Sequence, residues 1–224
     1  MIGFLITTYN RQESCQRLVD SLQGIGDITV VHDGTNYEIE GAVNINPRAH
    51  LGKEGYWRLV NLLFRNRGSH KYYFMIPDDF AICELQIRNA IEIWERIKDP
   101  QKICLNLFAD RIGKTCWTQF IPRDKGEVWQ TGWVDMCFLC EEIFFNELGI
   151  IPPIALNWRE RPWMSSGVGA YISRRLFKRG RHFYQVKDSL VTPQEAHGMS
   201  EMKNSKLYYD KRTFSHHTKS SEHS

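Results

Sequence analysis

Short apolar stretches and segments with helical periodicity alternate along the first 107 residues of the chain. The apolar stretches predict strands at 2–7, 28–31, 43–45, 72–76 and 103–107. Apolar residues spaced three and four apart predict helices at 12–22, 55–67 and 85–98. Because strand, helix and strand follow one another in this rhythm, the sequence predicts an α/β fold with a Rossmann-like, mostly parallel sheet flanked by helices.

The regular alternation of predicted strands and helices ends after Asp110. Residues 110–135 contain three Trp, mixed charge and short strand-like pieces, which indicates excursions of the chain around a ligand. Two more helices are expected at 141–148 and 173–179, the second with Ser173 as its N-cap. We therefore expect one domain over 1–203, with an irregular second half (110–203) after the first half (1–109), and a flexible basic tail over 204–224.

The composition is that of one ordinary folded domain. With 224 residues, of which 42% are hydrophobic and 25% charged, the chain can bury a core, which excludes disorder and collagen-like repetition. Its longest apolar stretches are far shorter than the roughly 20 residues of a membrane-spanning helix, so no membrane insertion is expected. The amino terminus lacks the pattern of a secretory signal, which predicts a cytoplasmic protein with reduced cysteines.

Basic residues are unevenly distributed, although the formal net charge is only +3. Five of them crowd into eight positions: Arg174, Arg175, Lys178, Arg179 and Arg181. Such a run is typical of a solvated helix face. The alternative is a surface that binds a polyanion such as DNA, because Lys and Arg near phosphates release counterions.

Three polar clusters follow predicted strands at their carboxyl ends. They are Thr7 to Arg11, His32-Asp33-Gly34, and Pro77-Asp78-Asp79-Phe80. In an open parallel sheet, ligands bind beyond the carboxyl ends of the strands, where such loops converge. The sequence therefore predicts a ligand site at this edge of the sheet.

The adjacent carboxylates Asp78 and Asp79 follow a buried strand directly. Two like charges this close are costly unless a cation neutralises them, and a divalent cation bound with substrate phosphates is the usual partner. The alternative is an acidic turn that caps the following helix, since Asp is a favourable N-cap residue.

Together these pieces resemble the nucleotide-sugar half of GT-A glycosyltransferases. The resemblance covers about the first half of the chain and rests on three pieces in the family's order: Ile2 to Arg11, Val31-His32-Asp33-Gly34, and Phe74 to Phe80. It implies a UDP-sugar donor and Mn²⁺ or Mg²⁺ as cofactor. The third acid of the family's metal-binding motif is missing, because Phe80 follows Asp79.

The resemblance also implies roles for individual residues. The loop that contains Thr7, Tyr9 and Arg11 would bind the nucleoside diphosphate, with Tyr9 stacking near the base. Asp33 would accept a hydrogen bond from the base. Asp78 would contact the donor, and Asp79 would bind the metal.

Lys53 lies in a Gly-Lys-Glu-Gly segment that lacks the spacing of a P-loop. In the GT-A interpretation it approaches the phosphates or the base, and otherwise it belongs to a solvated loop. Residues 189–191 and the segment His197-Gly198-Met199-Ser200 are similar to a late strand and a His-Gly-x-x-Ser segment of some GT-A enzymes. That likeness implies a metal ligand at His197, a role open to a neutral imidazole; the alternative is a tail histidine bonded to backbone.

Candidates for the acceptor side lie in the second half of the chain. Asp135, or Glu142, is the candidate base that deprotonates an acceptor hydroxyl if transfer inverts the anomeric centre, with Asp135 the first choice. Glu142 has an alternative as a first-turn acid that complements a helix dipole. A segment with guanidinium, aromatic and hydroxyl groups suits a sugar or a flat ring, or else forms a surface loop anchored by one Trp: Arg159, Trp163, Ser165 and Ser166.

These observations predict a hexosyl- or pentosyltransferase with no obligate protein partner. By general resemblance to phage enzymes, its acceptor would be a 5-hydroxymethyl pyrimidine in double-stranded DNA, and a phage-encoded protein would act in the host cytoplasm. The competing acceptor is a cell-surface saccharide. Two further alternatives are a nucleotidyltransferase, which would need a Gly-rich phosphate loop after the first strand, and a non-catalytic DNA-binding module.

Overall fold

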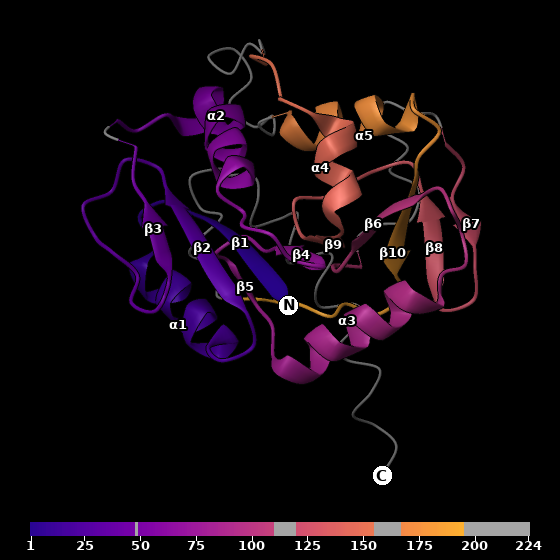
Figure 1. Ribbon diagram of the computed structural model, residues 1–224, viewed down its shortest axis with the longest axis horizontal. Helices are drawn as coiled ribbons and strands as arrows, with labels where there is room; N and C mark the ends of the chain where they lie inside the picture. The colour runs from indigo at the N-terminus through magenta and orange to yellow at the C-terminus, as the bar shows by residue number, and fades with distance from the viewer. Residues whose placement is uncertain (48, 110–119, 155–166, 195–224) are drawn as a thin grey trace.

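The computed structural model describes residues 1–47, 49–109, 120–154 and 167–194 (Figure 1). Within these residues the helices are α1 (Gln12–Leu22), α2 (Gly52–Arg65), α3 (Glu84–Arg96), α4 (Glu142–Leu148) and α5 (Val168–Phe177). The strands of the main sheet are β1 (Ile2–Thr8), β2 (Asp27–His32), β3 (Val43–Ile45), β4 (Tyr72–Met75), β6 (Lys102–Asn106), β7 (Arg123–Asp124), β8 (Val128–Thr131), β9 (Phe138–Cys140) and β10 (His182–Val186). A second, two-stranded sheet pairs β5 (Phe80–Ala81) with β11 (Thr192–Pro193).

The main sheet has nine strands in the order β3-β2-β1-β4-β9-β6-β10-β8-β7. The first four strands of this order pair in parallel, as do β6 and β10, while β9 is antiparallel to both β4 and β6. The prediction of a mostly parallel sheet flanked by helices is therefore confirmed. Because β9 lies between β4 and β6, the two predicted halves of the chain share one continuous sheet.

Helices cover both faces of the sheet (Figure 1). Successive residues of β1 point to opposite faces, so Phe4 and Ile6 pack with α1 and α3 while Leu5 packs with α2, α4 and α5. The helices bury the apolar positions that their periodicity marks, for example Leu18 of α1 and Leu63 of α2. The two cores explain why the strand sequences are apolar throughout.

The helix expected at 173–179 begins earlier, at Val168, and the prediction that Ser173 is its N-cap is wrong. Gly167, with a φ of 77°, precedes the first turn, and Ser173 lies fully buried inside α5. The Ser173 hydroxyl donates to Gly169 O at 2.7 Å and accepts the Val134 N–H at 2.9 Å. A Cβ on Gly169 would lie 2.9 Å from Val134 O, so glycine permits this close approach. The glycines and the buried serine obscured the helical period.

No helix in the described part of the chain is both long and apolar enough to cross a membrane.

Candidate active site

The three polar clusters predicted to form a site lie together at the carboxyl ends of β1, β2 and β4. Strand β1 lies between the other two, so the loops that follow these strands leave the sheet side by side. The Asp33 N–H, after β2, donates to Thr8 O at 2.9 Å. The Arg11 guanidinium, after β1, contacts Asp78 Oδ1, after β4, at 2.9 Å. The tertiary structure thus joins all three segments by direct contacts.

Asp33 is 5% exposed and is bonded to the start of α2. The N–H groups of Leu51 and Gly52 donate to its two carboxylate oxygens at 2.5 and 2.9 Å. His50 Nδ1 lies 2.9 Å from Asp33 Oδ2, and the His50 ring stacks on Tyr9 with centroids 4.3 Å apart. Asp33 therefore satisfies amide groups at the N-terminus of α2, which explains why this helix begins three residues before the predicted position. Its oxygens retain lone pairs for a further donor.

Two tyrosines connect the threonines at the end of β1 to neighbouring segments. The hydroxyl groups of Thr7 and Tyr56 are 3.3 Å apart, and those of Thr8 and Tyr37 are 3.1 Å apart. Tyr37 also accepts the Arg11 N–H at 3.1 Å. These contacts fix the direction in which the loop leaves β1.

Both carboxylates of the acid pair lie close to the Arg11 guanidinium. Arg11 Nη1 lies 2.9 Å from Asp78 Oδ1 and 3.6 Å from Asp79 Oδ2, while the side chains of Asp78 and Asp79 are only 5% and 15% exposed. Among the described residues, neither Asp78 Oδ2 nor Asp79 Oδ1 has a hydrogen-bond partner. Burial, with the charge of Asp78 as the second cause, raises the pKa of Asp79 to about 6, although Arg11 opposes the shift. Burial also raises the pKa of Asp78, and Arg11 partly offsets it.

This pair fits the donor set of a divalent cation, because it presents two buried carboxylate oxygens without partners. No group of three or more His, Cys, Asp or Glu side chains placed to hold a metal occurs within the described ranges. His197, the third ligand that the resemblance implies, lies outside those ranges. The described segment that precedes His197 is bonded to the acid pair, because the Gln194 N–H donates to Asp79 O at 2.6 Å.

Asp135 lies at the same edge of the sheet. Its N–H donates to Asn106 Oδ1 at 3.0 Å, directly at the end of β6. The pKa of Tyr56 is raised to about 12, mainly by burial and further by the carboxylates of Asp79, Asp78 and Asp135. The preferred candidate base and the acid pair therefore lie at the same edge of the sheet, and the charges of all three carboxylates act on Tyr56.

Glu142 does not join this site. Its carboxylate pairs with the Arg67 guanidinium and accepts the Tyr73 hydroxyl at 2.9 Å. Tyr73 lies near the start of β4, whereas Asp78 follows the end of that strand. The contacts of Glu142 are those of a structural ion pair at the opposite edge of the sheet.

The remaining predicted residues divide between two places. Lys53 is half-buried in the first turn of α2, next to the amide of Gly52 that Asp33 binds. The acceptor candidates all lie outside the described residues: Arg159, Trp163, Ser165 and Ser166.

Sequence reasoning missed Tyr37, His50, Tyr56 and Asn106, all of which contact predicted site residues. Tyr56 had a detectable signal, because it lies one turn after Lys53 on the same helix and therefore on a neighbouring surface. Asn106 lies next to the end of the predicted strand 103–107, as Thr7 ends its predicted strand and Asp78 follows another. Tyr37 and His50 come from irregular segments, where no periodicity marks a position.

Neither a protein-family profile nor a curated protein sequence matches the chain. Solved structures do match it in three dimensions. GalNAc-T7 with UDP, GalNAc and Mn²⁺ superposes with a TM-score of 0.62 at 15% identity, over 87% of this chain and 44% of that one. The chain thus spans less than half of GalNAc-T7.

Two further structures cover almost the whole chain. S. aureus TarS 1–349 has a TM-score of 0.55 at 10% identity, over 92% of this chain and 64% of TarS. Glucosyl-3-phosphoglycerate synthase from Mycobacterium tuberculosis, in complex with Mn²⁺ and UDP-glucose, has a TM-score of 0.55 at 12% identity, over 91% and 75% of the two chains. All three are nucleotide-sugar glycosyltransferases of one fold. With its polar clusters at the carboxyl ends of a nine-stranded, mostly parallel sheet, this chain has the GT-A fold.

Proposed function

We propose that the protein is a glycosyltransferase that takes a UDP-sugar as donor and depends on Mn²⁺ or Mg²⁺. The observation that carries this proposal is the buried acid pair Asp78 and Asp79, with two unpartnered oxygens beside the loop that follows β1. Two of the similar structures hold Mn²⁺ together with UDP or UDP-glucose. A non-catalytic DNA-binding module would have no use for two costly buried carboxylates.

The donor side of the site consists of three segments that touch one another. Thr7, Tyr9 and Arg11 would hold the nucleoside diphosphate, and Asp33 would accept an N–H of the base with its remaining lone pairs. Lys53 would approach the phosphates at the N-terminus of α2, where backbone amides and the helix dipole favour anions.

The acid pair would hold the divalent cation through Asp79 Oδ1 and Asp78 Oδ2. When bound, such a cation offsets the negative charge that the diphosphate gains as the sugar leaves. His197 would complete the ligand set. It follows Gln194 by three residues, so chain length alone limits the Cα separation to about 11 Å, and Gln194 is bonded to Asp79.

The acceptor side would use Asp135 as the base if the reaction inverts the anomeric centre. Its backbone is fixed by Asn106 at the same edge of the sheet as the acid pair. Arg159, Trp163, Ser165 and Ser166 would contact the acceptor. Glu142 is left out of the proposed site because it pairs with Arg67 at the other edge.

DNA gains no support as the acceptor. None of the three similar structures is described with a nucleic acid. Two of the basic residues that suggested DNA, Arg179 and Arg181, pair with Glu147, and Arg175 and Lys178 lie on an exposed surface as a solvated helix face would. The proposal therefore specifies an acceptor hydroxyl, and the test offers both saccharides and hydroxymethylated DNA.

The first test is donor binding. A UDP-sugar with Mn²⁺ at about 100 times its Kd should stabilise the fold by about 2.7 kcal/mol, a rise in Tm of about 5–11 °C for a chain of this size. Asp79→Asn should abolish that rise, because it removes a charged metal ligand. Asp20→Asn, an exposed acid on α1, is the matched control and should retain it. Equal stabilisation of wild type and Asp79→Asn would contradict the metal assignment.

The second test is transfer. The protein with Mn²⁺ and a panel of UDP-sugars is offered oligosaccharides, ordinary DNA and hydroxymethylated DNA, and products are analysed by mass spectrometry. A hexose- or pentose-sized increment on one acceptor identifies the reaction. Neither donor binding nor transfer with any UDP-sugar would refute the proposed function.

A further inference from the structure

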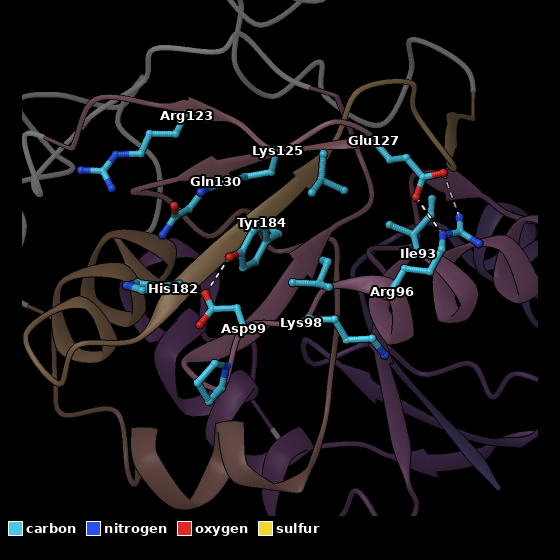
Figure 2. A pocket seen from close by; sticks show the side chains of 13 residues that line it. Ile93, Arg96, Lys98, Asp99, Arg123, Lys125, Glu127, Gln130, His182 and Tyr184 are labelled. Carbon is cyan, nitrogen blue, oxygen red and sulfur yellow. Dashed lines mark hydrogen bonds and ion pairs between the residues drawn. The ribbon is translucent and has the colours of Figure 1, made fainter.

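A cavity lies at the opposite edge of the sheet from Asp79, at the amino ends of β6 and β10 (Figure 2). Its volume is about 520 Å³, within the range of roughly 300–1,000 Å³ typical of small-molecule sites. The C-terminal part of α3, the turn after it and the β7–β8 hairpin form its walls. None of its lining residues belongs to the proposed donor or acceptor site.

Three directly adjacent strands form the floor of this cavity. Arg123 of β7 is the register partner of Gln130, and Gln130 is the register partner of Tyr184 of β10. Residues directly opposite each other on paired strands point to the same face, so these three side chains form one row.

Gln130 of β8 is only 4% exposed and lines the cavity. Its carboxamide can both donate and accept hydrogen bonds. In Figure 2 the Gln130 side chain extends from β8 into the space between the hairpin and His182. The amide is therefore placed to bond a ligand in the cavity.

The lining carboxylates already have hydrogen-bonding partners. Asp99 Oδ2 contacts His182 Nδ1 at 2.6 Å and accepts the Tyr184 hydroxyl at 2.6 Å. Glu127 accepts two bonds from Arg96, at 2.8 and 3.2 Å. Both acids already contact neighbouring side chains, which argues against a metal site.

Three of the lining cations have fewer partners than these carboxylates. Within the residues that the structure describes, Arg123 and Lys125 form no ion pair, and Lys98 donates only to a backbone carbonyl, Glu95 O, at 3.0 Å. Arg123 and Lys125 are two residues apart on the hairpin, so both side chains point to one face. The cavity therefore combines a carboxamide in its lining with a surplus of positive charge.

The wall on the α3 side is apolar. Ile93 and Ile97 lie one turn apart on α3 and its C-cap, and Pro100 follows them in the lining. An inorganic ion would leave this wall unused, whereas the carbon skeleton of a small organic molecule would cover it.

We propose that this cavity binds a small organic molecule that carries a phosphate or carboxylate group. Its charged group would lie between Arg123 and Lys125, and a polar group of the molecule would bond the Gln130 amide. The site is separate from the proposed donor site and does not depend on the proposed activity. Its position on the far edge of the sheet makes it a second ligand site of the same domain.

The test uses isothermal titration of the full chain with four probes: glucose 6-phosphate, glucuronate, inorganic phosphate and neutral glucose. We expect at least one of the two organic anions to bind more tightly than phosphate and glucose. The double variant Arg123→Ala/Lys125→Ala should weaken that binding about tenfold or more, equivalent to about 1.4 kcal/mol. The double variant Arg58→Ala/Arg65→Ala makes the same charge change on exposed positions of α2 and should bind like wild type.

The variants in this test are at exposed positions, so both are expected to fold. Gln130→Leu is the independent second variant and should also weaken binding, through loss of the amide. Preference for glucose 6-phosphate or for glucuronate identifies the anionic group. Binding of neither organic anion to wild type, equal binding of neutral glucose, or unchanged affinity in Arg123→Ala/Lys125→Ala would each overturn the proposal.

Discussion

Asp79 is held in an environment that disfavours its charge. Burial and the neighbouring Asp78 raise its pKa to about 6, against the partial compensation of Arg11. An acid with this pKa is ionised at neutral pH only at a cost to folding. Such a cost is typical of a carboxylate in a functional site.

The sign of this cost gives the first prediction. The pKa of Asp79 is raised from 3.8 to about 6, so the unfolded state loses its proton at lower pH than the folded state does. Stability therefore falls as pH rises from about 4 to about 6, by about 3 kcal/mol for a shift of this size. Asp79→Asn removes the charge, so without metal it should be more stable than wild type at pH 7.5 and lose that advantage near pH 4.

Urea unfolding of the metal-free protein at several pH values measures this difference. Asp20→Asn, which is exposed, should change the free energy of unfolding by less than about 0.5 kcal/mol at each pH. A metal-free Asp79→Asn that is less stable than wild type at neutral pH would show that Arg11 fully compensates the buried charge.

At the scale of elements, β9 separates two acids that the sequence places seven residues apart. Asp135 precedes β9 and lies at the edge of the sheet where Asp78 follows β4. Glu142 follows β9 and lies at the other edge with Arg67, because β9 runs antiparallel to β4. One strand direction therefore decides which of the two acids lies at the same edge of the sheet as Asp78.

This geometry predicts that one variant should lower activity and another should lower stability. Asp135→Asn should lower kcat by about 10²–10⁴ if it removes a general base, with little change in stability. Glu142→Gln should retain kcat within a few-fold but lower the free energy of unfolding, because it breaks a pair with Arg67. Transfer kinetics and urea unfolding of both variants distinguish these roles, and a large loss of kcat in Glu142→Gln alone would reverse the assignment.

At the scale of the whole molecule, the sheet is one unit built from interleaved parts of the chain. Strand β9 of the second half supplies the hydrogen-bond partner on one side of both β4 and β6. Phe138 and Phe144 also fill the core between the sheet and α2. The two predicted halves are therefore divisions of the sequence but not of the sheet.

It follows that residues 1–109 should not fold alone. This fragment would expose the unpaired edges of β4 and β6 and lose part of both cores. We expect it to show no cooperative thermal transition by circular dichroism, in contrast to the full chain. A fragment that melts cooperatively with dispersed amide resonances would show that the first half is an independent domain.

Much of the site was predictable because parallel strands that share a direction bring their carboxyl ends to one edge. Thr7, Asp33 and Asp78 follow predicted strands, and their convergence needed only the direction of those strands. His50 and Tyr37 come from irregular segments that reach the site through contacts between distant residues. No local sequence pattern predicts such contacts.

The sequence by itself determined the alternation of helices and strands, because burial of apolar side chains imposes periods of 3.6 and 2 residues within each segment. Only the tertiary structure decided that β9 lies between β4 and β6, that Asp135 rather than Glu142 lies at the same edge of the sheet as the acid pair, and that Gln130 lines a cavity at the far edge. Those features depend on which segments pair across long stretches of chain. Strand order and direction depend on the packing of the whole domain. The sequence of a single segment does not indicate which other segment it will pair with.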